Sequence, residues 1–203
     1  MVRCYTLIET KNEKDVLSIL RENIENYSIE KAFLISRKNI SCFALPLKEL
    51  EMRVTDAMAV SFENYNVAVA YEGQRHGESK ITEGLRREGL RIPEHITASL
   101  TMYVESGGFK REGFKKLKEK SLSLIRAQAG KEDKAIGYLE KIEAVTQAEK
   151  LSGIFNIITT NQGKNRADLR PVELGMTEID GVISAQSMKI LGGFAVKKKY
   201  SVS

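Results

Sequence analysis

The chain has 203 residues, of which 42% are hydrophobic and 29% are charged, and its formal net charge is +5. This composition is typical of a globular protein, and it excludes intrinsic disorder, a collagen-like repeat and a disulfide scaffold. At roughly 100–200 residues per domain, the length allows one domain or two small ones.

The first 36 residues predict a strand, a helix and a second strand. Residues 2–9 alternate apolar and polar side chains, which is typical of a strand. Residues 12–26 follow a capping-box pattern and carry apolar side chains at helical spacing, so we expect an amphipathic helix there. Residues 32–36 form a short apolar run, which predicts a strand. This β-α-β start indicates a sheet with a helix on its face.

The next segment mixes helical and strand patterns. Residues 40–52 have helical spacing, but Pro46 lies inside them, and a proline is tolerated only in the first turn of a helix. We therefore expect any helix here to begin near Pro46. Residues 57–62 and 65–71 are apolar and predict a pair of strands.

A short helix and a strand complete the first half. Residues 79–88 predict a helix that ends at Gly89, because glycine is the usual residue just after a helix. Residues 96–104 alternate apolar with polar side chains and predict a strand with one wet face. The Ser-Gly-Gly sequence at 106–108 marks a boundary, after which the composition becomes richer in charge.

The second half predicts mainly helices. Residues 111–129 and 131–151 carry apolar side chains at helical spacing on either side of Gly130, which indicates a helical hairpin. Residues 154–160 then predict an apolar strand. We expect a polar loop over 161–170.

The last segment predicts two short strands, at 172–176 and 194–196, around a helix at 182–191. The expected fold is α+β or α/β: a mixed β-sheet covered by helices, with a helical hairpin and a short β/α C-terminal segment. The expected organisation is a mixed α/β region over 1–105. A helix-led region over 106–203 would pack on it.

Basic residues gather in three groups, at 75–91, 110–120 and 197–199. Such groups can neutralise nucleic-acid phosphates, although solvated helix faces and a frayed tail explain them equally simply. The candidate nucleic-acid-binding residues are Arg75, Lys80, Arg86, Arg87, Lys110, Arg111, Lys115 and Lys116.

Apolar side chains on the expected helical hairpin supply candidates for docking a protein partner. The alternative is that this stripe belongs to the core, because a helical hairpin must bury its apolar face somewhere. The candidate partner-binding residues are Leu117, Leu124, Leu139 and Ile142.

Catalytic and metal-binding signals are weak. The two histidines, His76 and His95, and the two cysteines, Cys4 and Cys42, fit no metal or redox spacing, and no phosphate-binding or hydrolase motif is present. His76 beside Glu78 is an alternative general base. We expect no enzyme activity, no metal and no cofactor. The absence of a long apolar stretch and of a secretory signal predicts no membrane association and a cytoplasmic location.

One segment resembles a known family. Residues 80–90 read KITEGLRREGL, and Ile81, Gly84, Leu85 and Gly89 occupy positions of the short signature helix of the PRPK-binding protein family. The order of predicted elements over 2–105 is similar as well. The resemblance implies a non-catalytic subunit of the KEOPS complex, which makes threonylcarbamoyladenosine in tRNA. It implies docking on a kinase-like subunit and contact with tRNA.

The sequence therefore predicts a non-catalytic adaptor that binds a protein partner, with tRNA as a second partner. The alternative is a stand-alone or self-assembling nucleic-acid-binding protein encoded by a virus or a mobile element.

Overall fold

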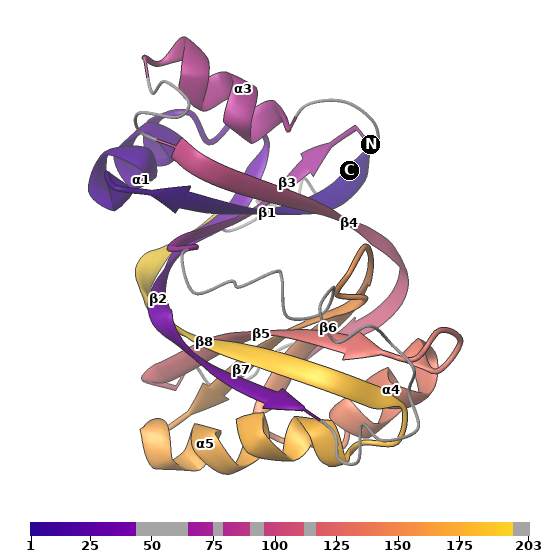
Figure 1. Cartoon of the computed structure of the whole chain (residues 1–203). Helices are drawn as coiled ribbons and strands as arrows, with labels where there is room; N and C mark the ends of the chain where they lie inside the picture. Colours follow the sequence, from indigo (N-terminus) through magenta and orange to yellow (C-terminus); the bar gives the residue numbers. More distant parts are fainter. Residues whose placement is uncertain (44–64, 75–78, 90–95, 112–116, 197–203) are drawn as a thin grey trace, which may run out of the picture. The chain divides into compact units, whose positions relative to one another are not determined.

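A computed structural model describes the chain outside residues 44–64, 75–78, 90–95, 112–116 and 197–203 (Figure 1). The described strands are β1 (Val2–Thr10), β2 (Ile29–Phe43), β3 (Val67–Gly73), β4 (Ile96–Lys110), β5 (Glu119–Ala127), β6 (Val145–Ser152), β7 (Ile157–Gly163) and β8 (Val182–Ala195). The described helices are α1 (Glu13–Glu22), α3 (Lys80–Arg87), α4 (Glu132–Leu139), α5 (Arg166–Gly175) and the short 3-10 helix η3 (Met176–Glu178).

The strands join in the order β1-β3-β2-β8-β5-β7-β6-β4, which closes on itself as a barrel. The β1–β3, β1–β4, β2–β3, β5–β7, β5–β8 and β6–β7 pairs are antiparallel. The predicted helix-covered mixed sheet is therefore wrong as a fold class. In a closed sheet both faces of a strand can be buried, so simple alternation fades from the sequence.

The chain divides into two compact units. Unit 1 contains Met1–Ser36, Tyr65–Val104 and the end of β8 from Leu191, and unit 2 contains Glu105–Ile190 and the end of β2 from Arg37. Each unit runs β-α-β-β-α-β among its described elements, and its strands lie in the same order, β2-β3-β1-β4 in unit 1 and β6-β7-β5-β8 in unit 2. This is the ferredoxin-like arrangement. The fold is therefore an internal structural repeat.

In unit 1 the two helices lie on one face of the strands (Figure 1). Val16 and Leu20 of α1 and Ile81 and Leu85 of α3 are fully buried in one apolar cluster with the strands. Their spacing of four residues places each pair on one side of its helix. Burial of this stripe fixes α1 and α3 on the sheet.

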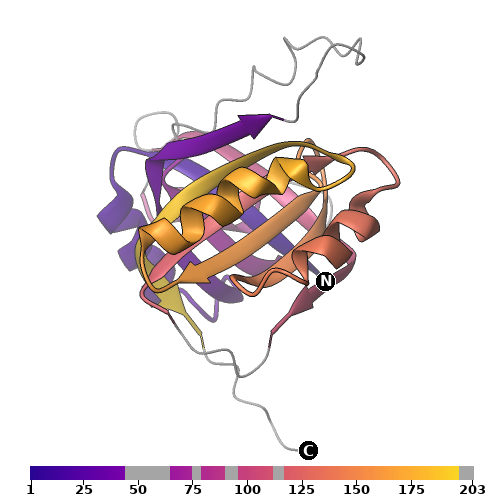
Figure 2. The same ribbon diagram turned by 90° about the horizontal axis from the view of Figure 1, so that it is seen from below.

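Unit 2 repeats the plan with α4 and α5, which lie side by side on one face of their strands (Figure 2). Ala135, Ile136 and Leu139 of α4 are buried with Ile125 of β5 and Met176 of η3. The helices are thus again on the side of the sheet that carries the apolar cluster.

Both units contain the same pair of hydrogen bonds, here called the clasp, in which one asparagine side chain binds the backbone N–H and C=O of a single strand residue. In unit 1, Asn66 accepts a hydrogen bond from Thr10 N at 3.0 Å and donates one to Thr10 O at 2.6 Å. In unit 2, Asn156 does the same with Ala127, at 2.7 Å and 2.9 Å. Each clasped residue follows an irregularity in strand pairing, so the amide adds two hydrogen bonds to the backbone where the register shifts.

A pair of equivalent glycines also recurs. Gly108 of β4 has φ +114° and Gly193 of β8 has φ +137°, a region that side chains disfavour. A Cβ at Gly108 would lie 2.9 Å from Glu149 Cα, and one at Gly193 would lie 2.8 Å from Phe33 Cα. Both positions therefore need glycine for a close approach of two strands.

Several predicted elements are confirmed. The strands expected at 2–9 and 96–104 are β1 and the first part of β4, and the helix expected at 79–88 is α3. The helix predicted over 12–26 is α1, which ends earlier, at Glu22. Gly89 has φ +88°, as the expected end of α3 requires.

The second half corrects the sequence prediction. The expected helical hairpin over 111–151 is β5, α4 and β6, and α4 is the only helix in the described part of this range. The strand expected at 172–176 lies in helix α5, and the helix expected at 182–191 is strand β8. Strands β5, β6 and β8 carry polar side chains on faces that the fold buries, so apolar and polar residues do not alternate along them as they do in a half-exposed strand. The elements expected around Pro46 and at 57–62 lie outside the described residues.

The described helices are all too short or too polar to cross a membrane.

Candidate functional site

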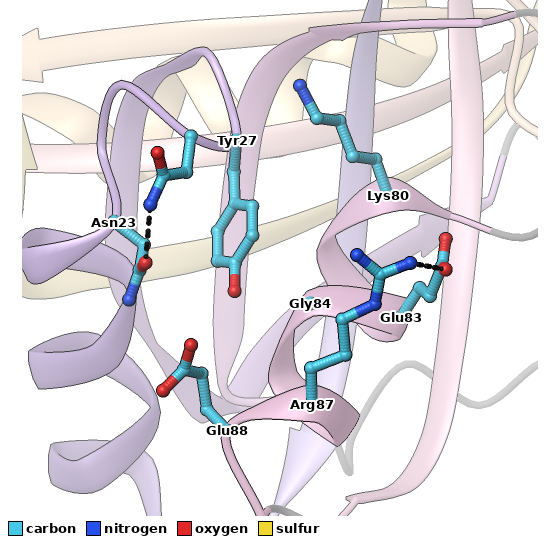
Figure 3. Close-up of a pocket in the computed structure, with 8 residues that line it drawn as sticks. Asn23, Tyr27, Lys80, Glu83, Gly84, Arg87 and Glu88 are labelled. Carbon is cyan, nitrogen blue, oxygen red and sulfur yellow. Dashed lines mark hydrogen bonds and ion pairs between the residues drawn. The ribbon is translucent and has the colours of Figure 1, made fainter.

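A pocket of about 290 Å³ lies in unit 1 where the end of α1 meets α3 (Figure 3). Its lining is polar and carries charges of both signs. The lining residues are Asn23, Asn26, Tyr27, Lys80, Glu83, Gly84, Arg87 and Glu88.

Two asparagine amides form the wall on the α1 side. Asn23 ends α1, with its backbone N–H donating to Ile19 O at 3.0 Å and its side-chain Nδ2 donating to the same oxygen at 3.1 Å. Asn26 Nδ2 donates to Asn23 Oδ1 at 3.0 Å. The helix end therefore orients both amides, a use of asparagine that suits helix termini.

Tyr27 lies against α3 at Gly84. The tyrosine is 9% exposed, and a Cβ at Gly84 would fall 2.6 Å from Tyr27 Cε1 and 2.8 Å from its hydroxyl oxygen. Only glycine lets the ring approach the helix this closely. Burial raises the pKa of the Tyr27 hydroxyl, and the nearby Glu88 carboxylate raises it further. The hydroxyl is therefore a neutral hydrogen-bonding group at neutral pH.

The charged side chains are contributed by α3. Arg87 and Glu83 form an ion pair one turn apart, with side chains 74% and 48% exposed. Such an exposed pair is weak and exchanges easily with solvent or a ligand. Lys80 and Glu88 lie at opposite ends of the pocket, with Tyr27 between them (Figure 3). Within the described residues, neither of these two forms an ion pair with another side chain.

The first turn of α3 adds a positive field beside Lys80. Ser79 caps the helix and accepts a hydrogen bond from Thr82 N. The start of a helix carries a partial positive charge, which favours an anion near it. One end of the pocket thus suits an anionic group, and the Glu88 end suits hydrogen-bond donors.

The predicted nucleic-acid-binding residues separate into three sets. Lys80 and Arg87 line the pocket, and Arg86 is exposed on the same helix. Lys110 is exposed at the end of β4 in unit 2. Arg75, Lys115 and Lys116 lie outside the described residues, as do His76 and His95.

Arg111 has a structural role. Its Nε donates to Val145 O at 3.0 Å, and its Nη2 donates to Ile142 O at 3.4 Å and to Glu140 O. These carbonyls follow the end of α4, where backbone acceptors need partners. The Arg111 guanidinium therefore stabilises the backbone that follows α4.

The predicted partner-binding residues belong to the interior of unit 2 or its margin. Leu124 of β5 and Leu139 of α4 are 0% exposed. Ile142 is partly buried and packs against the apolar cluster of unit 2, and Leu117 is half-buried. The alternative of a core role fits this burial, because the described part of 111–151 forms β5, α4 and β6 and not the expected helical hairpin.

Sequence reasoning missed Asn23, Asn26 and Tyr27. No motif marks them, and the only signal is a pair of asparagines where the α1 pattern fades. Among the residues that the structure describes, no group of three or more histidine, cysteine or acidic side chains is arranged to hold a metal ion.

Comparison with known proteins shows the fold alone. No protein-family model and no curated protein sequence matches the chain. The structure is similar to the crystal structure of the siroheme decarboxylase NirDL, with a TM-score of 0.59 and 5% sequence identity, over 95% of this chain and 72% of that one. The same enzyme in complex with an iron-uroporphyrin III analogue gives a TM-score of 0.49 and 6% identity.

This likeness corrects the prediction that the chain is not an enzyme. The chain shares its fold with a decarboxylase, so the expectation of a non-catalytic protein is contradicted. At 5% identity, no residue of its active site is carried over to this chain. The chain has the fold of siroheme decarboxylase NirDL.

Proposed function

We propose that unit 1 binds a single nucleotide of an RNA strand in the pocket between α1 and α3. The observation that carries this proposal is the mixed lining, with the Lys80 ammonium at one end, the Glu88 carboxylate at the other and amides beside them. A nucleotide has a matching polarity, because one end is an anionic phosphate and the other offers hydroxyl and amino donors.

Each part of a nucleotide has a counterpart in the lining. Lys80 and the start of α3 suit a phosphate. The Asn26 amide keeps its Oδ1 and its second Nδ2 hydrogen beyond its bond to Asn23, so it suits the edge of a base, which asparagine recognises by paired hydrogen bonds. The Glu88 carboxylate suits a ribose hydroxyl or an exocyclic amine, and the 2′-hydroxyl is the group that distinguishes RNA from DNA.

The charges and the volume restrict the ligand further. A simple anion such as sulfate would be repelled by Glu83 and Glu88, and a simple cation by Lys80. Small-molecule pockets span roughly 300–1,000 Å³, and this one, at about 290 Å³, has room for one nucleotide and not for a duplex. RNA recognition by sequence typically uses such unpaired, splayed-out nucleotides.

The test measures the binding of fluorescently labelled single-stranded RNA to the full chain as salt is increased. Lys80→Ala should weaken binding by about 10-fold and lower the salt slope by about one phosphate contact. Asn26→Ala should weaken binding with no change in salt slope. Lys14→Ala is the matched control, because it removes an exposed lysine of α1 that does not line the pocket.

Three results would refute the proposal: no RNA binding at low salt, equal effects of Lys80→Ala and Lys14→Ala, or tighter binding of siroheme than of RNA at the same pocket. The RNA recovered from the complex is analysed for chemical change, so that turnover would be detected. Binding of a protein partner and a cytoplasmic location stay predictions of the sequence.

A further inference from the structure

Three charged side chains of α3 line the pocket together. Lys80, Glu83 and Arg87 are spaced by three and four residues, which makes them neighbours on one side of the helix. At about 1.5 Å per residue, Lys80 and Arg87 lie about 10 Å apart along the helix axis. The helix therefore presents two cations to the pocket, with one carboxylate between them.

Arg87 is occupied in the free chain. Its Nη2 donates to Glu83 Oε1 in an ion pair (Figure 3). A guanidinium binds carboxylates and phosphates through the same planar set of N–H donors. The Glu83 carboxylate therefore uses donors that would otherwise be available to a phosphate.

The Arg87–Glu83 pair can be exchanged for another anion because both side chains are in contact with solvent. They are 74% and 48% exposed, and pairs of this kind contribute little to stability. An RNA strand already bound at Lys80 holds its next phosphate close to Arg87, which gives that phosphate a high effective concentration. The phosphate can then compete with the carboxylate for the same donors.

We propose that Glu83 masks Arg87, by occupying its donors in the free chain, and that a second phosphate of the bound RNA replaces the carboxylate, an inference that rests on the function proposed above. Lys80 and Arg87 then contact successive phosphates, one on each side of the bound nucleotide. The ligand is accordingly a nucleotide inside a strand. A nucleoside monophosphate has one phosphate only and would leave the Arg87–Glu83 pair intact.

This exchange of partners determines how binding depends on salt. In the wild-type chain Arg87 gains a phosphate, while Glu83 loses its partner and takes up a cation from solution. The counterion released from the phosphate is thereby offset. In Glu83→Gln the amide keeps the size of the side chain without its charge, so the Arg87 contact releases a counterion with no such uptake.

The experiment measures the affinity of labelled single-stranded RNA for the full chain over a range of salt concentrations. Glu83→Gln should bind about 2- to 5-fold more tightly at low salt, because an exposed ion pair no longer has to be broken. Its plot of log K against log salt should be steeper by about 0.7, the value for one phosphate of a single strand. Glu25→Gln is the matched control and should behave as wild type, because Glu25 is exposed after α1 and does not line the pocket.

A double-mutant cycle separates the exchange of partners from simple repulsion of RNA by Glu83. In an Arg87→Gln background there is no ion pair to break, so Glu83→Gln should give no gain in affinity. Repulsion alone would give the same gain in both backgrounds, and that result would overturn the proposal.

Two further outcomes separate the masking of Arg87 from the RNA site itself. If the wild-type chain binds RNA and Glu83→Gln binds it no more tightly, the masking is overturned and the RNA site stands. If neither the wild-type chain nor Glu83→Gln binds RNA at low salt, the RNA site is overturned and the masking with it.

Discussion

The contact between Tyr27 and Gly84 gives a prediction whose magnitude follows from two opposing effects. In Gly84→Ala, the new methyl group would lie 2.6 Å from Tyr27 Cε1, closer than non-bonded carbon atoms approach. Because the ring is only 9% exposed, it cannot swing aside freely. Overpacking of this kind costs about 1–3 kcal/mol.

The same substitution also removes a glycine from the interior of a helix. Alanine is favoured over glycine there by about 0.8–1 kcal/mol. The clash is severe, so we expect it to exceed this gain, and Gly84→Ala should lower the free energy of unfolding by about 1–2 kcal/mol. At roughly 2–4 °C per kcal/mol for a chain of this size, Tm should fall by about 2–8 °C.

The assay is urea and thermal unfolding of the full chain, followed by circular dichroism. Gly137→Ala is the matched control: Gly137 lies inside α4, and a Cβ there would have no atom within 4 Å. This variant should be more stable than wild type by up to about 1 kcal/mol.

A double-mutant cycle isolates the clash. Tyr27→Leu removes the Cε1, Cζ and hydroxyl atoms that the new methyl group would meet. In that background Gly84→Ala should no longer destabilise the chain. The reasoning is refuted if Gly84→Ala is as stable as wild type, or if its cost is unchanged in the Tyr27→Leu background.

Three further predictions test the structural assignments. Arg111→Ala should lower the free energy of unfolding by about 1–3 kcal/mol, because it leaves the carbonyls after α4 without a charged donor. Lys110→Ala should change the free energy of unfolding by less than about 0.5 kcal/mol. Equal effects of the two variants in urea unfolding would contradict this prediction. Asn66→Ala and Asn156→Ala should each lower the free energy of unfolding by about 1–3 kcal/mol, since each removes a two-bond clasp, which is buried at Asn66 and partly buried at Asn156, and a loss in only one unit would refute their equivalence. Cys4 is 0% exposed, and burial raises the pKa of its thiol, so it stays protonated in the folded chain above the pH at which an unfolded thiol ionises. Stability should therefore fall as pH rises beyond the ordinary thiol range, and iodoacetamide should modify this site, by mass spectrometry, only after unfolding; rapid native labelling would contradict it.

The elements of the first half could be predicted from the sequence because each of them carries a single clear helix or strand pattern. The first part of β4 alternates, and α3 has a capping serine, a buried stripe and a terminal glycine. Each of these signals is local and arises from one element alone. The strand and helix expected there are confirmed.

The second half was misread because its strands are polar on a face that the helices cover. Ser121 and Ser123 of β5 are buried, as are Leu122 and Leu124 on the opposite face. Burial of both faces removes the contrast on which strand prediction depends. With that contrast absent, charged residues nearby produced a helical pattern.

The internal repeat was also invisible in the sequence. The equivalent positions keep a clasping asparagine, at Asn66 and Asn156, and a close-approach glycine, at Gly108 and Gly193. Elsewhere the register pairs different residues, such as Tyr71 with Asn161. A few identities separated by unequal gaps do not form a recognisable period.

Only part of the pocket lining was predicted from the sequence. Lys80 and Arg87 stand out by their charge, whereas Asn23 and Tyr27 belong to no motif.

The chain passes between the two units inside three of the described strands. β2 does so between Ser36 and Arg37, β4 between Val104 and Glu105, and β8 between Ile190 and Leu191. At none of these three points does the chain have a linker that could be shortened safely. A fragment cut there would end in a severed strand, whose unpaired N–H and C=O groups favour pairing with other chains and aggregation.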